Sequence, residues 1–533
     1  MTVPFTTTLL EGRRRVRGPF TPLVAIAAVC AFTACTPPTP RIDGAPGAPP
    51  NPQSQWTIPS SARTPPPPAA PPIVTTATAA LRTDSATVGG TTQLSMTDVV
   101  DLALRNNPAT RESWATARAA ADQYGAARSS LFPTVNGTIN LTRTGSSAGN
   151  FGTFGNTGGT VIDTSGTRNG LNTATRSQLT PALSLSYLVF DLGGRAGTIE
   201  ASKQRAISTD LLHNVTVQNV VLQVESALFS FLATRALRDA DLVAVQEAQA
   251  DTAAAEARLR VGVGTLEEVL QTRTALAQAR LNLATIDGNL LAARGALAAA
   301  MGFPAHSRFD IPTITTTDSV AAIAASVDTL INRAITQRPD LAEARAEAEV
   351  LAAEIRVARS AGYPALTLSS TASYARQLQG TTNTTSGRNY SLVLGLQIPI
   401  FNGFAREYDV KTAREQYDAG LARVASTTQQ ISVQVFTSYA ALQTATQRVI
   451  AAAELLTSAS QSADVSLGRY REGVGTIVDV LLARSALASA RADEIQSRWE
   501  WRTALAQLAH DTGSLDLGGR PNIPLAPLPG ARR

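Results

Sequence analysis

The chain has 533 residues, of which 16% are charged, and its formal net charge at pH 7 is +5. Only two cysteines and three histidines are present, and the histidines (His213, His306 and His510) are scattered, so we expect no metal site and no cofactor. Residues 1–34 contain four arginines and one glutamate, and without them the charge is 5 − 3 = +2, which gives no support for nucleic-acid binding. We also find no catalytic constellation and predict that the protein is not an enzyme.

The first 34 residues are predicted to be a secretory signal peptide. Basic residues at 13–17 precede the apolar run Leu23 to Ala34, which is too short to span a bilayer. The sequence Phe32-Thr33-Ala34-Cys35 resembles a lipoprotein cleavage box, although leucine is more usual than Phe32. On this reading Cys35 is the lipid attachment site, carrying acyl chains such as palmitate. The alternative is an ordinary signal peptide with an incidental thiol.

Residues 35–93 form a linker on this reading. The stretch from Thr36 to about Thr92 is rich in Pro, Ala, Ser and Thr and has no hydrophobic periodicity. We therefore predict a disordered or polyproline spacer between Cys35 and the folded part of the chain.

Two pairs of helices are predicted next. Ser95-Met-Thr-Asp98 can cap a short helix that runs to Leu104, and Pro108 opens a second helix to Leu131. The segments 328–337 and 339–359 repeat this pair.

Four strands of about ten residues are predicted from alternating apolar residues, the length of a tilted transmembrane strand. The alternating residues are Val135, Ile139 and Leu141, then Leu183, Leu185, Tyr187 and Val189, then Leu366 and Leu368, and finally Leu392, Leu394, Leu396, Ile398 and Ile400. Polar loops, 145–178 and 377–389, separate the strands of each pair. A soluble sheet is the alternative. Because about eight strands are needed to close a small barrel, several chains must share a membrane barrel.

A helical hairpin is predicted from Arg406 to Asp511. Its first arm, to Arg471, would be about 100 Å long at 1.5 Å per residue. The arm ends at two glycines, and Thr476 can cap the returning helix. A seven-residue repeat along the first arm predicts coiled-coil packing of large against small side chains. The large residues are Val435, Leu442, Val449 and Leu456, and the small ones are Ser438, Ala445, Ala452 and Ala459.

The hairpin occurs twice. The tips align at a fixed shift, 475 − 264 = 211, and Phe190-Asp191 with Arg195 aligns with Phe401-Asn402 and Arg406 at the same shift. Upstream, Pro108 aligns with Pro339 and Phe132-Pro133 with Tyr363-Pro364, both at a shift of 231. The first copy therefore has an insertion of 231 − 211 = 20 residues between Pro133 and Phe190, which we expect to lengthen a loop. We predict a tandem duplication with units at 94–304 and 305–513, followed by a tail at 514–533.

This order of elements resembles TolC-like outer-membrane efflux proteins, and the lipobox points to the lipoprotein branch of that family. The resemblance implies an α+β membrane protein in which each repeat is a helix pair, two strands and a long helical hairpin. It implies a homotrimer with a 12-stranded β-barrel in the outer membrane, continuous with a periplasmic α-helical barrel. Such a trimer is a passive exit duct that contacts outer-membrane lipid, docks to a periplasmic adaptor protein and works with an inner-membrane transporter.

The resemblance also assigns roles to the hairpin tips. It implies that Val263, Gly264 and Thr265 in the first copy, with Val474, Gly475 and Thr476 in the second, bind the adaptor. The alternative is that these glycines only turn the chain.

A periplasmic gate is implied at Asp479, with Glu268 at the corresponding place in the first copy. Because Leu482 stands where some relatives have a second Asp, we expect a weak acidic ring. Its candidate holding residues are Arg469, Arg471 and Arg484. The alternative is that both acids only stabilise helix N-termini.

A second functional hypothesis is a periplasmic adaptor with a coiled-coil hairpin and a lipid anchor. It is disfavoured because adaptors carry one hairpin inserted in a β domain, whereas this hairpin is duplicated and flanked by strand pairs.

Overall fold

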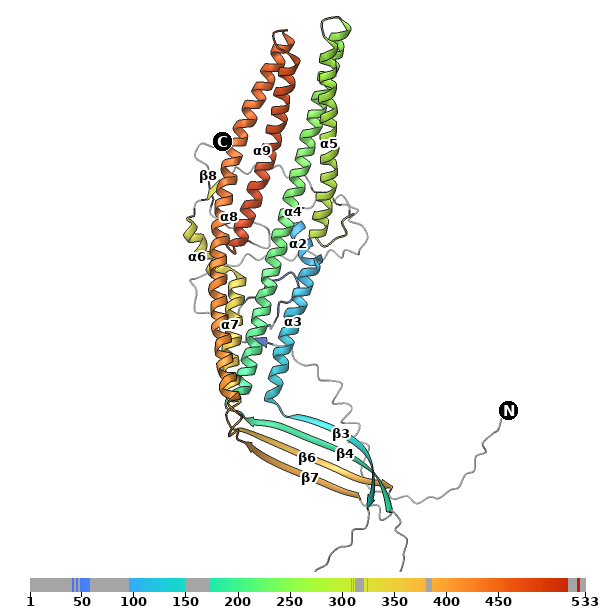
Figure 1. Cartoon of the computed structure of the whole chain (residues 1–533), viewed down its shortest axis with the longest axis vertical. Coiled ribbons are helices and arrows are strands. Elements are labelled where there is room, and N and C mark those ends of the chain that lie inside the picture. Colours follow the sequence, from blue (N-terminus) through green and yellow to red (C-terminus); the bar gives the residue numbers. More distant parts are fainter. Residues whose placement is uncertain are drawn as a thin grey trace, which may run out of the picture.

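The computed structural model describes residues 41–42, 45–46, 48–57, 95–148, 172–307, 309, 311, 321–323, 325–379, 386–515 and 525–527. Long helices form a rod with the hairpin tips at one end and a sheet at the other (Figure 1). The N-terminal half contains β1 (Arg41–Ile42), β2 (Ala45–Pro46), α2 (Met96–Asn106), α3 (Pro108–Arg128), η2 (Ser129–Leu131), β3 (Thr134–Ala148), β4 (Asn172–Phe190), α4 (Gly194–Arg260) and α5 (Leu266–Ala300). The C-terminal half contains β5 (Ala321–Ile323), α6 (Val327–Gln337), α7 (Pro339–Ser360), β6 (Ala365–Gln379), β7 (Ser386–Gln397), α8 (Ala405–Arg471), α9 (Ile477–Asp511) and β8 (Leu525–Pro527).

The helices of the two repeats match in length. Helices α2 and α6 have 11 residues each, α4 and α8 have 67 each, and α5 and α9 have 35 each. The predicted duplication of a long hairpin is therefore present in three dimensions, and each long arm extends about 100 Å.

The short helices begin where the sequence predicts. Ser95 and Asp98 form a capping box at the start of α2, in which each side chain bonds the other residue's backbone N–H. At α3, Asn107 accepts a hydrogen bond from Ala109 N–H, and Pro108 occupies the first turn, where its missing N–H costs nothing. The predicted end at Leu131 is wrong in detail, because α3 stops at Arg128 and a 3₁₀ turn follows.

The four long strands form one antiparallel sheet in the order β3-β4-β6-β7. They have 15, 19, 15 and 12 residues, so they are longer than the predicted ten and extend into the segments predicted as loops. The β4–β6 pairing joins the two repeats. Among the described residues, β3 and β7 are edges with one unpaired side each.

The aligned residues Phe190-Asp191 with Arg195, and Phe401-Asn402 with Arg406, lie at the turn from strand to helix, which has a similar backbone in both repeats. Left-handed backbone conformations occur at Leu192 (φ 52°) and Gly193 before α4, and at Gly403 and Phe404 (φ 67°) before α8. Beside each turn an arginine donates to a backbone carbonyl: Arg195 to Leu188 at 2.8 Å, and Arg406 to Gly362 at 3.0 Å.

The main hydrophobic core lies at mid-length, where short and long helices meet. Its fully buried members include Val99, Leu228, Leu297, Leu442 and Leu508. The predicted repeat on α8 faces inward: Val435, Leu442 and Val449 are buried with the four small residues, and Leu456 is half-buried. Helix α4 contains an 18-residue window apolar enough to cross a membrane, but α4 packs against α3, α5, α7 and α9 as a core helix does.

Residues 48–57, which we call the N-terminal strap, belong to the segment predicted to be a disordered or polyproline spacer, but they pack against the folded part of the chain. They lie against α3 and α4, where Trp56 is 6% exposed, and Ile42 just upstream is fully buried. The expectation fails here because proline-rich composition describes local stiffness and carries no information about a groove formed elsewhere in the chain. The C-terminal tail also contains an ordered element, because β8 pairs with β5.

Candidate functional site at the hairpin tips

The two hairpin tips have the same backbone structure. Gly262 and Gly473 adopt positive φ angles of 80° and 78°. The next two backbone N–H groups in each tip donate to the same carbonyl, that of Arg258 or Arg469, at 3.0 and 3.1 Å. This pattern closes the end of a helix with a left-handed residue.

The second glycine of each tip lies close to the end of the preceding helix. Gly264 and Gly475 do not have positive φ angles, but a Cβ on either would lie close to the preceding helix end, 2.9 Å from Arg258 Cβ or 3.1 Å from Arg469 Cβ. These glycines therefore let the turn pack closely. Val263 and Val474, at 66% and 68% exposure, are the most accessible apolar side chains of the six predicted tip residues.

The two tip threonines cap the returning helices. The Thr265 hydroxyl accepts from Glu268 N–H, and the Thr476 hydroxyl accepts from Asp479 N–H, both at 3.2 Å. Asp479 completes a capping box, because its Oδ2 accepts from Thr476 N–H at 3.1 Å and from the Thr476 hydroxyl at 2.9 Å. The hydrogen bond from the Thr476 backbone, with that from its hydroxyl, lowers the pKa of Asp479.

Glu268, which corresponds to Asp479 in the first repeat, lies near the other hairpin. No capping box forms at Thr265. Burial raises the pKa of Tyr470, and the nearby Glu268 carboxylate raises it further. The Arg258 guanidinium lies over the Tyr470 ring, 4.8 Å from its centre. Near the tips, α4 and α5 of the first hairpin therefore contact α8 of the second through a tyrosine between an acid and a base.

An ion-pair cluster also joins α4 to α9 along the hairpins. Arg484 contacts Glu247 at 2.8 Å and Asp251 at 2.7 Å, and Arg491 contacts Glu247 at 3.2 Å. Burial raises the pKa of Asp251, and Arg484 acts in the opposite direction. These contacts begin 484 − 477 = 7 residues from the start of α9, about 10 Å from the tip.

Of the three arginines predicted to hold the gate, only Arg484 pairs with acids across the hairpins. Arg471 lowers the pKa of Asp251, and Arg469 lowers that of Asp479, both as minor contributions. Sequence reasoning missed Glu247, Asp251 and Arg491. Their spacing, four residues for the acids and seven for the arginines, places each pair on one helix face, but it does not reveal which helix lies opposite.

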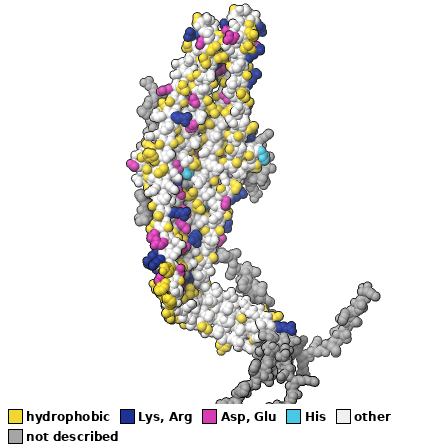
Figure 2. All heavy atoms as spheres, in the orientation of Figure 1, with side chains coloured by type: hydrophobic (Ala, Val, Ile, Leu, Met, Phe, Trp, Pro, Cys, Tyr) yellow, Lys and Arg dark blue, Asp and Glu magenta, His cyan; other side chains and the backbone are white. Residues whose placement is uncertain are grey.

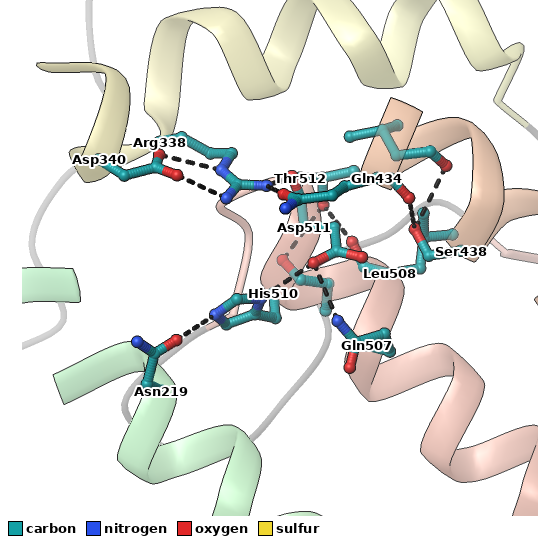
Figure 3. A network of polar contacts seen from close by, with 12 residues as sticks. Asn219, Arg338, Asp340, Gln434, Ser438, Gln507, Leu508, His510, Asp511 and Thr512 are labelled. Atoms are coloured by element: carbon teal, nitrogen blue, oxygen red, sulfur yellow. Dashed lines mark hydrogen bonds and ion pairs between the residues drawn. The ribbon is translucent and has the colours of Figure 1, made fainter. Parts of the chain in front are cut away.

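A second polar cluster lies at mid-length, where α7 begins and α9 ends (Figure 3). The Arg338 guanidinium bonds both carboxylate oxygens of Asp340, at 3.0 and 2.6 Å, and donates to Gln434 Oε1 at 2.8 Å. His510 links α9 to α4, with Nε2 2.9 Å from Asn219 Oδ1 and Nδ1 3.0 Å from Asp511. The cluster lines a cavity of about 610 Å³. It therefore ties four helices together between the sheet and the tips.

Among the residues that the structure describes, no group of three or more His, Cys, Asp or Glu side chains is placed to hold a metal ion. Cys35 lies outside the described residues.

Comparisons with known proteins agree on one family. A family model described as "Outer membrane efflux protein" matches residues 99–303 and 330–514. Protein CyaE of Bordetella pertussis is 25% identical over 436 residues, covering 80% of this chain and 86% of CyaE. A solved structure of CusC aligns with a TM-score of 0.65 at 21% identity, covering 78% of this chain and 92% of CusC. The structure of VceC from Vibrio cholerae aligns with a TM-score of 0.63 at 19% identity, covering 78% of this chain and 96% of VceC.

Proposed function

The chain belongs to the outer membrane efflux protein family, and from this premise we propose that it forms a trimeric exit duct, closed at the hairpin tips and docked there to a periplasmic adaptor. The protein is an efflux component of the outer membrane, with its helices in the periplasm, and this decides between the duct and the adaptor hypothesis in favour of the duct. The observation that carries the proposal is one chain that joins a sheet with two free edges to helices about 100 Å long.

The sheet supplies the membrane-spanning part. Apolar side chains at alternate positions of β7 and the segment after it are exposed, namely Leu392, Leu394, Leu396, Ile398 and Ile400. Figure 2 shows hydrophobic side chains gathered where the helices meet the sheet, and there Phe401, Phe404 and Tyr408 are exposed. Aromatic residues in this position are typical of the interface between a membrane and water.

The free edges and two exposed stripes supply the trimer contacts. An edge strand in lipid must find a partner, so β3 of one chain pairs with β7 of the next, and three sheets of four strands close a 12-stranded barrel. Leu266, Leu270, Leu281 and Leu291 form an exposed stripe on α5. Val433, Leu455 and Val465 are exposed on α8, away from its buried stripe. These stripes face neighbouring chains in the proposed assembly.

The contacts between hairpins hold the duct closed. Arg484 and Arg491 restrain the second hairpin against the first through Glu247 and Asp251. All four side chains are largely shielded from water, so these pairs are stronger than fully exposed ones. The tips stay accessible to the adaptor through Val263 and Val474.

The experiment is conductance of the purified trimer in planar bilayers. The double variant Arg484→Gln/Arg491→Gln should raise the mean conductance severalfold over a small wild-type value, because the hairpins lose their restraint. The matched control is Arg273→Gln, which removes the aligned arginine of the first repeat, paired with Glu256 inside its own hairpin. Large conductance from the wild type, or equal conductance of double variant and control, would refute the closed-tip proposal.

A further inference from the structure

The N-terminal strap is held mainly through its backbone. The Asn214 side chain contacts Trp56 at two points: it accepts from Trp56 N–H at 2.8 Å, and its amide donates to Trp56 C=O at 2.8 Å. His213 Nε2 lies 3.2 Å from Ser54 C=O, and Trp114 Nε1 donates to Pro49 C=O at 3.0 Å. Since a carbonyl only accepts, His213 carries its proton on Nε2 here.

The contacting side chains are themselves fixed. His213 is fully buried, and its other ring nitrogen lies 2.8 Å from the Ser113 hydroxyl on α3. Trp56 of the strap and Ile42 just upstream of it join a buried cluster with residues of α3, α4 and α7, which includes Tyr124, Ile207 and Leu211.

The second repeat provides an internal comparison. At the shifts of 231 and 211, Ser113 and Trp114 correspond to Ala344 and Arg345, and His213 and Asn214 correspond to Val424 and Ala425. The corresponding helices form in both repeats, so these four polar or aromatic residues are not needed to form them. They are present only in the repeat that holds the strap.

We infer that the face of α3 and α4 in the first repeat is a docking groove for the N-terminal strap of the same chain, recognised by Ser113, Trp114, His213 and Asn214. Its occupant is the proline-rich strap, which bends and turns along its length. The groove binds the backbone carbonyls of Pro49, Ser54 and Trp56 and the Trp56 N–H, and the side chains of Trp56 and of Ile42, just upstream of the strap, fill the apolar part.

Docking in the groove also limits how far the lipid anchor can lie from the helices. This inference rests on the proposed lipid attachment at Cys35. From Cys35 to Ile42 there are 42 − 35 = 7 residues, which reach at most about 25 Å. The α4 residues of the buried cluster, Ala206 to Leu211, lie 12 to 17 residues beyond Gly194, or about 18 to 26 Å along the helix. The tether is thus just long enough to reach the sheet end of α4 while the strap is docked.

Chymotrypsin provides the test, because it cleaves after tryptophan and Trp56 is shielded when docked. His213→Val/Asn214→Ala gives the groove the residues of the second repeat. In the intact trimer, cleavage after Trp56 should become at least tenfold faster. The control Gln218→Ala, which changes the cavity wall one turn further along α4, should cleave at the wild-type rate. If the double variant loses the trimer, the variant Ile42→Ser, just upstream of the strap, replaces it, since that change leaves the groove intact and should also speed cleavage. If the groove variant, or the Ile42 variant used in its place, is cleaved after Trp56 at the wild-type rate, the docking-groove proposal is overturned.

Deleting three residues within 36–40 tests the tether. Cleavage after Trp56 should accelerate in the lipidated protein but not in a Cys35→Ser background, where the tether has no fixed end. Acceleration in both backgrounds, or in neither, would overturn the tether while leaving the groove and the duct to their own tests.

Discussion

At the scale of single residues, equivalent acids in the two repeats make different contacts. Asp479 closes a capping box with Thr476, whereas Glu268 lies near Tyr470 of the other hairpin. Capping does not remove the charge of Asp479, because hydrogen bonds from Thr476 lower its pKa and keep it ionised. One carboxylate can therefore start a helix and, in a trimer, contribute to a ring of three charges.

Asp479→Asn should weaken the cation selectivity of the pore. The N-cap of α9 is Thr476, which this variant leaves unchanged, so the charge is removed while the cap is kept. The reversal potential in a salt gradient across a planar bilayer measures the effect. Glu268→Gln is the comparison and should shift the potential less, because Glu268 faces Tyr470. Identical reversal potentials for wild type and Asp479→Asn would leave Asp479 as a helix cap alone.

Two buried acids on α4 make stability depend on pH. Burial raises the pKa of Asp210 and of Glu225 to about 8, and Asp210 has no hydrogen-bond partner among the described residues. The folded state then holds protons that the unfolded state has released above about pH 4, so stability falls as the pH rises from about 4 to 8. Asp210→Asn should flatten this fall in melting temperature. The exposed Asp122→Asn is the control, and equal slopes for both variants would contradict the burial argument.

At the scale of elements, three adjacent residues of each tip have three different roles. Gly475 packs against the end of α8, Thr476 caps α9, and Val474 is exposed. Docking is therefore better tested at the valines than at the glycines, because bulky residues at Gly264 or Gly475 would also distort the turn.

Val263→Asp/Val474→Asp should abolish export while leaving the amount of trimer unchanged. An exposed apolar side chain contributes little to folding but becomes buried when a partner docks. Survival of cells on a toxic exported compound and crosslinking to the adaptor measure the effect. Wild-type export and crosslinking in this variant would show that the tips do not dock. As the control, Val261→Asp changes a residue of similar exposure before the turn.

At the scale of the whole molecule, the proposed membrane attachment has two parts of unequal size. The sheet presents rows of exposed apolar side chains on strands of 12 to 19 residues. The lipid proposed at Cys35 would add a smaller apolar contact that supplements the sheet. The sheet should therefore hold the trimer in the membrane without help.

Cys35→Ser behind a cleavable signal should still sediment with outer membranes and run as a trimer on unboiled gels. The strands remain, and they bury much more apolar surface than the lipid. A folded, fully soluble product would contradict the assignment of the sheet to the membrane.

The sequence by itself determined the elements and their duplication, because those depend on local chemistry. The capping residues Ser95 and Thr476, Pro108, and the seven-residue repeat beginning at Val435 act within a few turns of their own helix, and the structure confirms them. The hairpin turns at Gly262 and Gly473 were predictable for the same reason.

Only the tertiary structure decided which surfaces meet. The pairing of Arg484 with Asp251, the place of Glu268 beside Tyr470 and the seating of Trp56 on Asn214 join residues far apart in the chain. Strand ends were also mispredicted, since the ladder continues through polar residues such as Ser146 as long as a partner such as Ala174 lies opposite. Local patterns indicate how a segment folds, but a contact between distant segments also depends on how the helices and strands are arranged around them.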